Sequence, residues 1–368
     1  MAMKDSTKEA GLPARRRSGV RRGRPYPVLV VGGGAAGQKA ALDLAHLGLE
    51  VILAERETSL GGTMARLGAM FPLHNCLLCR GEARHGPGCT RPTLSPDLLD
   101  HARPPNLAVW TRSRVLGAEA CEGGFRVSVR REPRWVEPER CISCDRCAQV
   151  CPQSLPDPFE AGLVHRKAAH RPSLRPVPDA YAIDKGPYCE GCGKCAAVCP
   201  TGAVSLEEQP RTETVRASAI VLATGLRLFD PALSQEYGYG RFANVFTGLE
   251  MERMCSPSGP GEGRILRRSD GRPPQRIAWL QCVGSRDKNH DYCSAFCCGY
   301  ATRQAVLARQ LLPSAEARIF LMDDRVFSRS FSAVYEPLRR AYGLGLERCR
   351  LSVPVSYTHL TLPTIYSV

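Results

Sequence analysis

Two kinds of segment are missing from this 368-residue sequence. No window approaches the roughly 18 uninterrupted apolar residues of a membrane-spanning helix. No signal peptide is recognisable, because the first 25 residues are polar and basic and the next apolar run, Val28–Val31, leads straight into glycines. The eight histidines show no metal-ligand spacing. We therefore expect a protein of a reduced compartment, the cytoplasm, with no membrane span.

Positive charge is plentiful, with a formal net charge of +14, but it is not arranged as in a nucleic-acid-binding protein. The basic residues are scattered, and no basic block interleaved with aromatic residues occurs. A protein that carries anionic clusters and a pyrophosphate also needs compensating positive charge. Nucleic acid is therefore not an expected partner.

Cysteine is unusually abundant, with 18 residues in the chain. Disulfide scaffolds of this density are usually short and secreted, and this chain has neither property. The cysteines are therefore predicted to act mainly as metal ligands.

The order of predicted elements indicates an α/β fold with one nucleotide-type unit, an interruption, and a second such unit. The first unit has strands at 27–31 and 50–55 around a helix that runs through Gly48. Strands at 107–111 and 125–130 are expected to form an antiparallel hairpin, and 219–225 a buried strand. The second unit has strands at 277–282 and 317–322 around a helix at 300–312. The expected divisions are a disordered basic tail (1–25), the first part of an FAD-binding domain (26–139), an inserted module (140–204), the return segment (205–257), an incomplete second domain (258–355) and a foreign tail (356–368).

A dinucleotide site is predicted directly after the first strand. Gly32, Gly34 and Gly37 fit G-x-G-x-x-G, with Ala36 inside the motif, at the point where a strand gives way to a helix. Glycines allow the tight turn and the close approach of the pyrophosphate, which then faces the helix N-terminus. Glu55 ends the second strand, where a carboxylate accepts hydrogen bonds from ribose hydroxyls. Two further stretches resemble those of two-dinucleotide flavoproteins and favour FAD over NAD: Gly61-Gly62 and Ala223-Thr224-Gly225.

The strongest pattern is a pair of C-x2-C-x2-C-x3-C-P runs. In two-cluster ferredoxins the fourth cysteine of each run ligates the other 4Fe–4S cluster. Zinc sites use C-x2-C pairs and have no need of four-cysteine runs that end in Cys-Pro. The sequence therefore predicts two clusters, one held by Cys141, Cys144, Cys147 and Cys199, the other by Cys189, Cys192, Cys195 and Cys151.

A second cysteine constellation lies at the strand end and helix start of the second unit, which are side by side in a βαβ unit. It comprises Cys282, Cys293, Cys297 and Cys298. A pyridine nucleotide would be expected there, and we interpret the four thiols as ligands of a third 4Fe–4S cluster. Two alternatives stay open: buried packing cysteines, or a nucleotide held by Gly284 and Arg286.

The remaining cysteines are less informative. Cys76 and Cys79 form a C-x2-C pair for which a redox dithiol, cluster ligation and packing are equally open. Cys89, Cys121, Cys255 and Cys349 are most simply packing residues.

With these residues in hand, the chain resembles the A subunit of heterodisulfide reductase and its relatives, including the corresponding subunit of quinone-interacting membrane-bound oxidoreductases. The matching stretches span roughly residues 27–345 and are VLVVGGGAAG, SLGGTMARLGAMFP with the following NCLLC, REPRWVEPERCISCDRCAQVCP, HRKAAHRPSLRPVPDAYAID, YCEGCGKCAAVCPTGAV and IAWLQCVGSRDKNHDYCSAFCCGYATRQA. The last stretch is highly specific and contains the second constellation, which matches the family's unusual cluster ligands.

The resemblance implies a thioredoxin reductase-like, two-dinucleotide-binding Rossmann fold with an inserted α+β dicluster ferredoxin module. It also implies an oxidoreductase component that exchanges electrons among FAD, iron–sulfur clusters and partner subunits, in some members by bifurcation at the flavin. Ferredoxin-type or hydrogenase-type donors are expected partners. Two further functions stay open: an NAD(P)H-dependent flavin oxidoreductase with attached ferredoxin, as in the small subunit of glutamate synthase, and a non-catalytic iron–sulfur wiring scaffold.

The chain departs from the family pattern at both ends. The additional N-terminal domain of some members is absent, and the sequence stops inside the second nucleotide-type domain. The final SYTHLTLPTIYSV contains no Asp, Glu, Lys or Arg, in a chain of which 23% is charged. We therefore expect a C-terminally truncated fragment with a foreign tail, poor in flavin.

Overall fold

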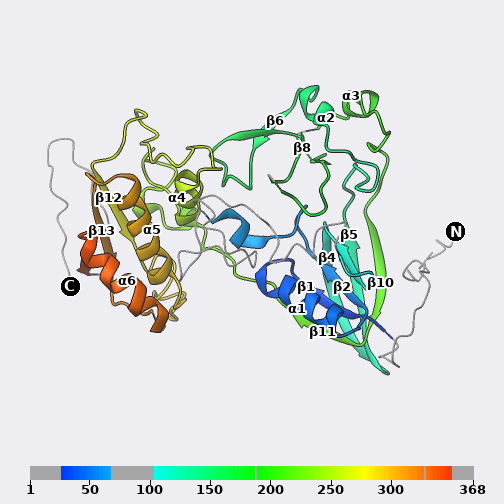
Figure 1. The fold of residues 1–368 in the computed structure, drawn as a ribbon, viewed down its shortest axis with the longest axis horizontal. Coiled ribbons are helices and arrows are strands. Elements are labelled where there is room, and N and C mark those ends of the chain that lie inside the picture. The colour runs from blue at the N-terminus through cyan, green and yellow to red at the C-terminus, as the bar shows by residue number, and fades with distance from the viewer. Residues whose placement is uncertain (1–25, 68–102, 174, 187–188, 327–328, 350–368) are drawn as a thin grey trace.

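The computed structural model describes residues 26–67, 103–173, 175–186, 189–326 and 329–349. Cys76, Cys79, Cys89 and both expected tails lie outside these residues. Within them, the chain forms three parts that Figure 1 shows separately. We name them the N-terminal unit (β1–β5, β10 and β11), the insertion (residues 140–204) and the C-terminal unit (η3 to β14).

The N-terminal unit is built on a parallel sheet with the order β11-β1-β2-β3. Its first strands are short and wholly apolar, as expected of parallel strands that are covered on both faces. Helix α1 packs on one face through Ala41, Leu42 and Ala45. The elements are β1 (Val28–Val31), α1 (Ala35–His46), β2 (Val51–Ala54), the short 3-10 helix η1 (Gly62–Arg66), β3 (Leu107–Trp110) and β11 (Ala219–Leu222).

An antiparallel sheet of order β10-β5-β4 packs on the other face, where Val127, Val129 and Val215 meet Leu29 and Ile52. Its strands are β4 (Ser113–Cys121), β5 (Gly124–Arg131) and β10 (Arg211–Ala217). The predicted hairpin between 107–111 and 125–130 is therefore wrong. The first of these strands joins the parallel sheet, and β4 is the hairpin partner of β5.

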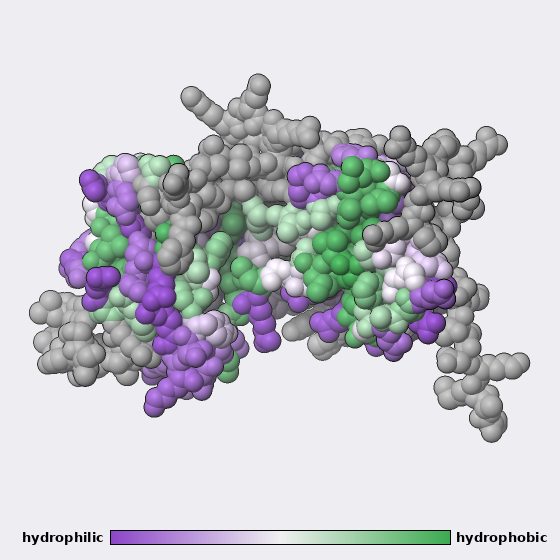
Figure 2. Space-filling view, turned by 90° about the horizontal axis from the view of Figure 1, so that it is seen from below, coloured by the Kyte–Doolittle hydropathy of each residue, from purple (hydrophilic) through white to green (hydrophobic). Residues whose placement is uncertain are grey.

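The strand at 219–225 is shorter and less buried than predicted. β11 ends at Leu222 and lies at the edge of the parallel sheet, and Leu222 is 75% exposed. In the view from below, apolar residues gather on the N-terminal side of the molecule, and the C-terminal unit is more hydrophilic (Figure 2).

The insertion has little regular structure and lies above the N-terminal unit in Figure 1. Two one-turn helices, α2 (Arg146–Gln149) and α3 (Lys194–Ala197), pack against each other. Each begins after a residue with left-handed backbone, Asp145 at φ 67° and Gly193 at φ 71°, as expected of a repeated local fold. The short strands are β6 (Ser154–Pro156), β7 (His165–Lys167), β8 (Ala169–His170) and β9 (Ala182–Ile183), and a bridge between Val136 and Val204 closes the segment.

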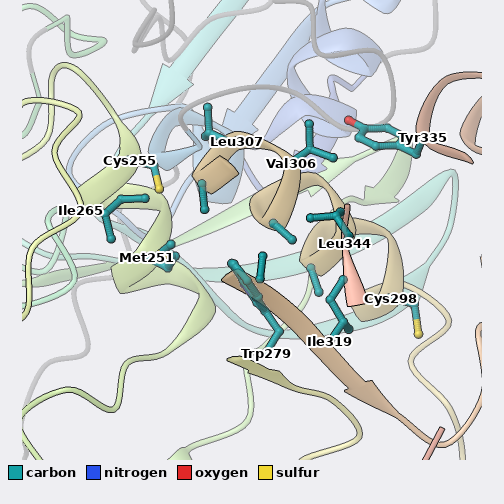
Figure 3. Packing of buried hydrophobic residues seen from close by; sticks show 14 of the residues in the cluster. Met251, Cys255, Ile265, Trp279, Cys298, Val306, Leu307, Ile319, Tyr335 and Leu344 are labelled. Carbon is teal, nitrogen blue, oxygen red and sulfur yellow. The ribbon is translucent and has the colours of Figure 1, made fainter. Parts of the chain in front are cut away.

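The C-terminal unit contains a parallel sheet of order β12-β13-β14 with helix α5 buried against it. Figure 3 shows Val306 and Leu307 of α5 near Met251 of α4 and Ile319 of β13. The sequence predicted its first βαβ unit but not α4, α6 or β14. The elements are the 3-10 turns η3 (Pro231–Leu233) and η4 (Gln235–Tyr237), then α4 (Gly248–Cys255), β12 (Arg276–Leu280), α5 (Cys297–Leu311), β13 (Glu316–Leu321), α6 (Arg329–Ala341) and β14 (Gly345–Arg348).

Among the residues that the structure describes, no helix is both long enough and apolar enough to cross a bilayer.

Candidate cofactor sites

The glycine loop between β1 and α1 has the shape that a pyrophosphate requires. A Cβ at Gly37 would lie 1.8 Å from the carbonyl oxygen of Gly32, so only glycine lets the helix approach the strand this closely. Gly34 precedes the first turn of α1, where a Cβ would meet nothing within 4 Å and where no side chain caps the helix. Ala36 is exposed in the same turn. No side chain thus occupies or caps this helix start, which fits an anionic ligand.

Glu55 lies at the end of β2 and is 6% exposed. One carboxylate oxygen accepts a hydrogen bond from the Gly33 amide at 2.6 Å, and the other accepts one from the Glu57 amide at 2.8 Å. Glu55 thus holds the glycine loop by a hydrogen bond to Gly33. It lies at the end of β2, where the sequence predicts a contact with ribose.

The two additional glycine-containing stretches both reach this loop. The Gly61 amide donates to the Gly33 carbonyl at 2.9 Å, and a Cβ at Gly62 would lie 3.0 Å from the Gly34 Cα. From the other side, the Ala223 amide donates to Val31 at 2.8 Å, and Thr224 and Gly225 follow. Segments that are far apart in the sequence therefore surround the glycine loop.

The insertion contains two cavities, and each is lined by four of the predicted ligand cysteines. The first cavity is lined by Cys141, Cys144, Cys147 and Cys199 together with Tyr181. The second cavity is lined by Cys189, Cys192, Cys195 and Cys151 together with Lys194. In each case three cysteines of one run meet the fourth cysteine of the other, which is the crossed arrangement that the spacing predicts.

Hydrogen bonds to sulfur are part of the first cavity. The Tyr181 amide donates to Cys141 Sγ at 3.5 Å, and the Ala203 amide donates to Cys199 Sγ at 3.2 Å. Burial opposes ionisation of Cys199, but hydrogen bonds from Thr201 and nearby amides outweigh it and lower the pKa of that thiol. Hydrogen bonds of this kind are among the factors that set cluster reduction potentials.

The central cysteine of each run is more buried. Burial raises the pKa of Cys147 to about 12, and it raises the pKa of Cys195 as well. A thiol with a raised pKa stays protonated at neutral pH unless a metal displaces its proton. The four-sulfur lining of each cavity supplies the ligand set for such a metal group.

The number and order of the thiols fit a cluster. Among the described residues, no three His, Cys, Asp or Glu side chains converge closely enough to share one metal ion. A zinc ion needs its four ligands about 2.0–2.3 Å away in a tetrahedron. In a cubane each of four thiolates binds a different iron, and each cavity is lined by four cysteines.

The second constellation is gathered around the start of α5. Cys282 follows β12, and Cys297 and Cys298 begin the helix. The Cys298 thiol donates to Cys297, which is the chief reason that the pKa of Cys297 falls to about 6, with smaller contributions from Ser294 and from the Cys282 backbone. Cys298 is 6% exposed at the margin of the core, with its sulfur directed away from the core residues (Figure 3).

Cys293 and Cys282 both lie close enough to Arg286 to interact with its charge. Burial opposes the charge of that guanidinium, but its hydrogen bond and charge interaction with Asp323 raise its pKa, with smaller contributions from Cys282 and Cys293. Cys282 and Cys293 thus lie near one cation, and the backbone of Cys282 also contacts Cys297.

The alternative nucleotide site at this corner is obstructed. Gly284 has a φ of 67°, and a Cβ there would lie 2.2 Å from the Phe229 ring. Arg286 forms an ion pair with Asp323. The glycine is therefore covered by an aromatic side chain, and the arginine is already paired with a carboxylate. This geometry disfavours a phosphate held by Gly284 and Arg286.

Comparison with known proteins agrees with these sites. Residues 27–83 match the family model of FAD-dependent oxidoreductases, and residues 134–154 match the 4Fe–4S binding domain. The A subunit of the H2:CoB-CoM heterodisulfide, ferredoxin reductase of Methanothermobacter marburgensis is 37% identical over 336 residues, or 91% of this chain and 49% of the relative. Over the span that the two share, this chain is a homologue of the heterodisulfide reductase A subunit.

Other relatives in the family have the same relation to the chain. The iron–sulfur A subunit of the CoB–CoM heterodisulfide reductase of Methanocaldococcus jannaschii is 39% identical over 88% of this chain and 47% of its own length. The A subunit of the ferredoxin:CoB-CoM heterodisulfide reductase of Methanosarcina mazei is 35% identical over 90% of this chain and 40% of its own length. The chain thus spans about half the length, or less, of the curated relatives that it matches.

Among solved structures, the thioredoxin reductase of T. acidophilum aligns with 88% of this chain and 64% of its own, at a TM-score of 0.39 and 11% identity. The thioredoxin reductase of Lactococcus lactis aligns at a TM-score of 0.36 and 14% identity, over 87% and 63% of the two chains. The two parallel units with a cysteine-rich insertion, together with the two family matches, confirm the predicted fold class.

Several residues at these sites could not be recognised from the sequence. Tyr181 lines the first cavity, Arg134 donates to the Tyr181 carbonyl, and Phe229 covers Gly284, yet none belongs to a cofactor-binding motif. Their roles depend on contacts between segments dozens of residues apart. Arg134 and Tyr181 lie within stretches that carry the family resemblance, but nothing in those stretches pointed to these roles.

Proposed function

We propose that the chain carries electrons between FAD at the glycine loop and two 4Fe–4S clusters in the insertion, as part of a heterodisulfide reductase-like complex. The observation that carries this proposal is the crossed lining of the two cavities. Such clusters exchange single electrons, whereas a flavin accepts pairs and releases them singly. The chain's own residues supply the thiolates, the loop amides and Glu55.

The partners are proposed from the family. The relatives are named as subunits, which supports further subunits here, and two of their names include ferredoxin, which supports a ferredoxin-type donor or acceptor. We also propose the domain boundaries expected from the sequence. The bridge between Val136 and Val204 supports an insertion that begins and ends close to 140 and 204.

The test is anaerobic preparation of the protein followed by counting of flavin, iron and zinc. We expect about eight irons from the two crossed sites, or about twelve if the third constellation also binds a cluster. FAD should be present but below one per chain in this 368-residue form, in line with the flavin-poor fragment expected from the sequence. Zinc in place of iron would contradict the proposal. Stoichiometric iron with no flavin would favour a wiring scaffold instead.

We also propose that Cys282, Cys293, Cys297 and Cys298 hold the third cluster. Support comes from the contacts of Cys297 with Cys298 and with the Cys282 backbone at the start of α5, and from the covering of Gly284 by Phe229, which disfavours a pyridine nucleotide. Cys298→Ser should lower the iron content by about four per chain. Unchanged iron, or rapid reduction of the flavin by NADPH, would favour an NAD(P)H-dependent oxidoreductase.

A further inference from the structure

A buried arginine joins the dinucleotide site to the insertion. Arg134 precedes the first cysteine run and is 7% exposed. Its guanidinium donates to the Thr58 carbonyl at 2.6 Å, to the Ala180 carbonyl at 2.6 Å and to the Tyr181 carbonyl at 2.8 Å. Thr58 belongs to the N-terminal unit and the other two acceptors belong to the insertion. Because a guanidinium presents its donors in a rigid planar fork, it holds both parts at once in one geometry.

Backbone contacts reinforce this junction on the dinucleotide side. The Leu60 amide donates to the Val177 carbonyl at 3.1 Å, and the Val177 amide donates to the Ser59 hydroxyl at 2.9 Å. The next residue, Gly61, is hydrogen-bonded to Gly33 of the glycine loop. The segment that receives Arg134 is therefore continuous with the predicted flavin site.

On the other side, the junction reaches a predicted cluster ligand through one residue. The Tyr181 carbonyl accepts from Arg134, its amide donates to Cys141 Sγ, and its hydroxyl donates to Asp145 at 2.5 Å. Tyr181 also lines the first cavity. Movement of Arg134 would therefore displace the wall of that cavity.

Parts of a chain that are joined only by linkers move relative to one another by default, because their interfaces are small and polar. Electron transfer between two centres falls steeply with their separation, so such movement would vary the rate. A short, buried set of hydrogen bonds between the two sites removes that freedom.

We propose that Arg134 is a positioning residue that fixes the distance and orientation between the dinucleotide site and the first cavity. The proposal rests on the proposed function, because that function places a flavin in one site and a cluster in the other. Arg134 contacts neither group and acts through Thr58 and Tyr181.

The test compares the unaltered protein, purified anaerobically with its natural subunits, with Arg134→Lys. Lysine keeps the charge but cannot reach three carbonyls in one plane. The readout is the spin–lattice relaxation of the flavin semiquinone, which a nearby reduced cluster accelerates according to distance. We expect unchanged flavin and iron content and a several-fold smaller acceleration. Arg171→Lys is the matched control, because Arg171 pairs with Asp179 inside the insertion and is partly exposed.

Each outcome decides the matter. Normal acceleration in Arg134→Lys with full cofactor content would overturn the proposal. If that variant does not accumulate in folded form, Ser59→Ala replaces it, since it removes the acceptor for the Val177 amide together with a local hydrogen bond to the Leu60 carbonyl. A smaller acceleration in Ser59→Ala supports the proposal and an unchanged one overturns it. Absence of flavin or iron from the unaltered protein would instead overturn the proposed function.

Discussion

A second buried arginine, Arg253, offers the sharpest test of how the C-terminal unit is attached. Its side chain is fully buried, and its guanidinium donates to both carboxylate oxygens of Glu160, at 2.8 and 2.9 Å. It also donates to the Arg66 carbonyl at 3.1 Å and lies 5.0 Å from the centre of the Phe159 ring. Arg253 belongs to α4, whereas Glu160 belongs to the insertion. This bidentate pair therefore links the two parts across their interface.

Arg253→Met would remove the counter-charge and leave Glu160, whose side chain is 15% exposed, without a cation in contact. Breaking a buried pair in this way costs about 3–5 kcal/mol, because the remaining charge is desolvated and uncompensated. In the double variant Arg253→Met with Glu160→Gln no charge is left behind. Its cost should therefore be smaller than that of Arg253→Met alone, which gives a favourable coupling of about 0.5–3 kcal/mol.

The assay is hydrogen exchange followed by mass spectrometry, which reports the opening free energy of peptides that cover 157–163 and 248–255. A global melting temperature is less suitable, because a multidomain protein with bound cofactors does not unfold in two states. The control is Arg264→Met, which breaks an exposed pair with Glu262 and should cost less than about 1 kcal/mol. A loss of that size or smaller in Arg253→Met would refute the reasoning.

Three further outcomes are expected. Cys151→Ser should remove about four irons and the spectroscopic signal of the cluster in the second cavity, because Cys151 lines that cavity with Cys189, Cys192 and Cys195. Loss of the cluster in the first cavity alone would contradict crossed ligation. Gly37→Ala should abolish flavin binding, measured as FAD released on denaturation, since a Cβ at Gly37 would lie 1.8 Å from the Gly32 carbonyl oxygen. The control Gly117→Ala should retain flavin, because a Cβ at Gly117 would meet nothing within 4 Å. Burial lowers the pKa of His170 from 6.5 to about 4, so the imidazole is neutral in the folded protein. Unfolding lets it take up a proton more readily, so its contribution to stability is complete above about pH 6.5 and declines as the pH falls toward 4. The opening free energy of peptides that cover 165–171, measured by hydrogen exchange between pH 7 and 5, should therefore be less pH-dependent in His170→Gln than in the unaltered protein. Equal slopes would show that His170 is not responsible.

The local motifs were predictable because each is complete within a short stretch of chain. Glycine at three positions after an apolar strand specifies a turn that other residues cannot adopt, and two four-cysteine runs specify ligand spacing directly. The units β1-α1-β2 and β12-α5-β13 were predictable from the same kind of local pattern. The position of Cys151 beside the second run and of Cys199 beside the first was predictable too. In each run the fourth cysteine follows a helical turn and precedes a proline, so it lies away from the other three.

Strand partners were less predictable. The strand at Leu107–Trp110 is continuously apolar and the strand at Gly124–Arg131 alternates apolar with polar residues. That pattern does not name the partner of either strand, so the sequence did not show that one joins the parallel sheet and the other an antiparallel sheet. The exposure of Leu222 could not be predicted either. It depends on whether another strand lies beside β11, and β11 is at the edge of its sheet.

By itself, the sequence determined the kinds of cofactor site and the cysteines that line the first and second cavities, because these depend on residue type and spacing within a few turns of chain. The tertiary structure alone decided how the parts are joined. Arg134 meets Thr58 and Tyr181, Arg253 meets Glu160, and Phe229 covers Gly284, and the two members of each pair lie 47 residues or more apart in the sequence. Such contacts arise from packing of surfaces that form only when the whole chain has folded.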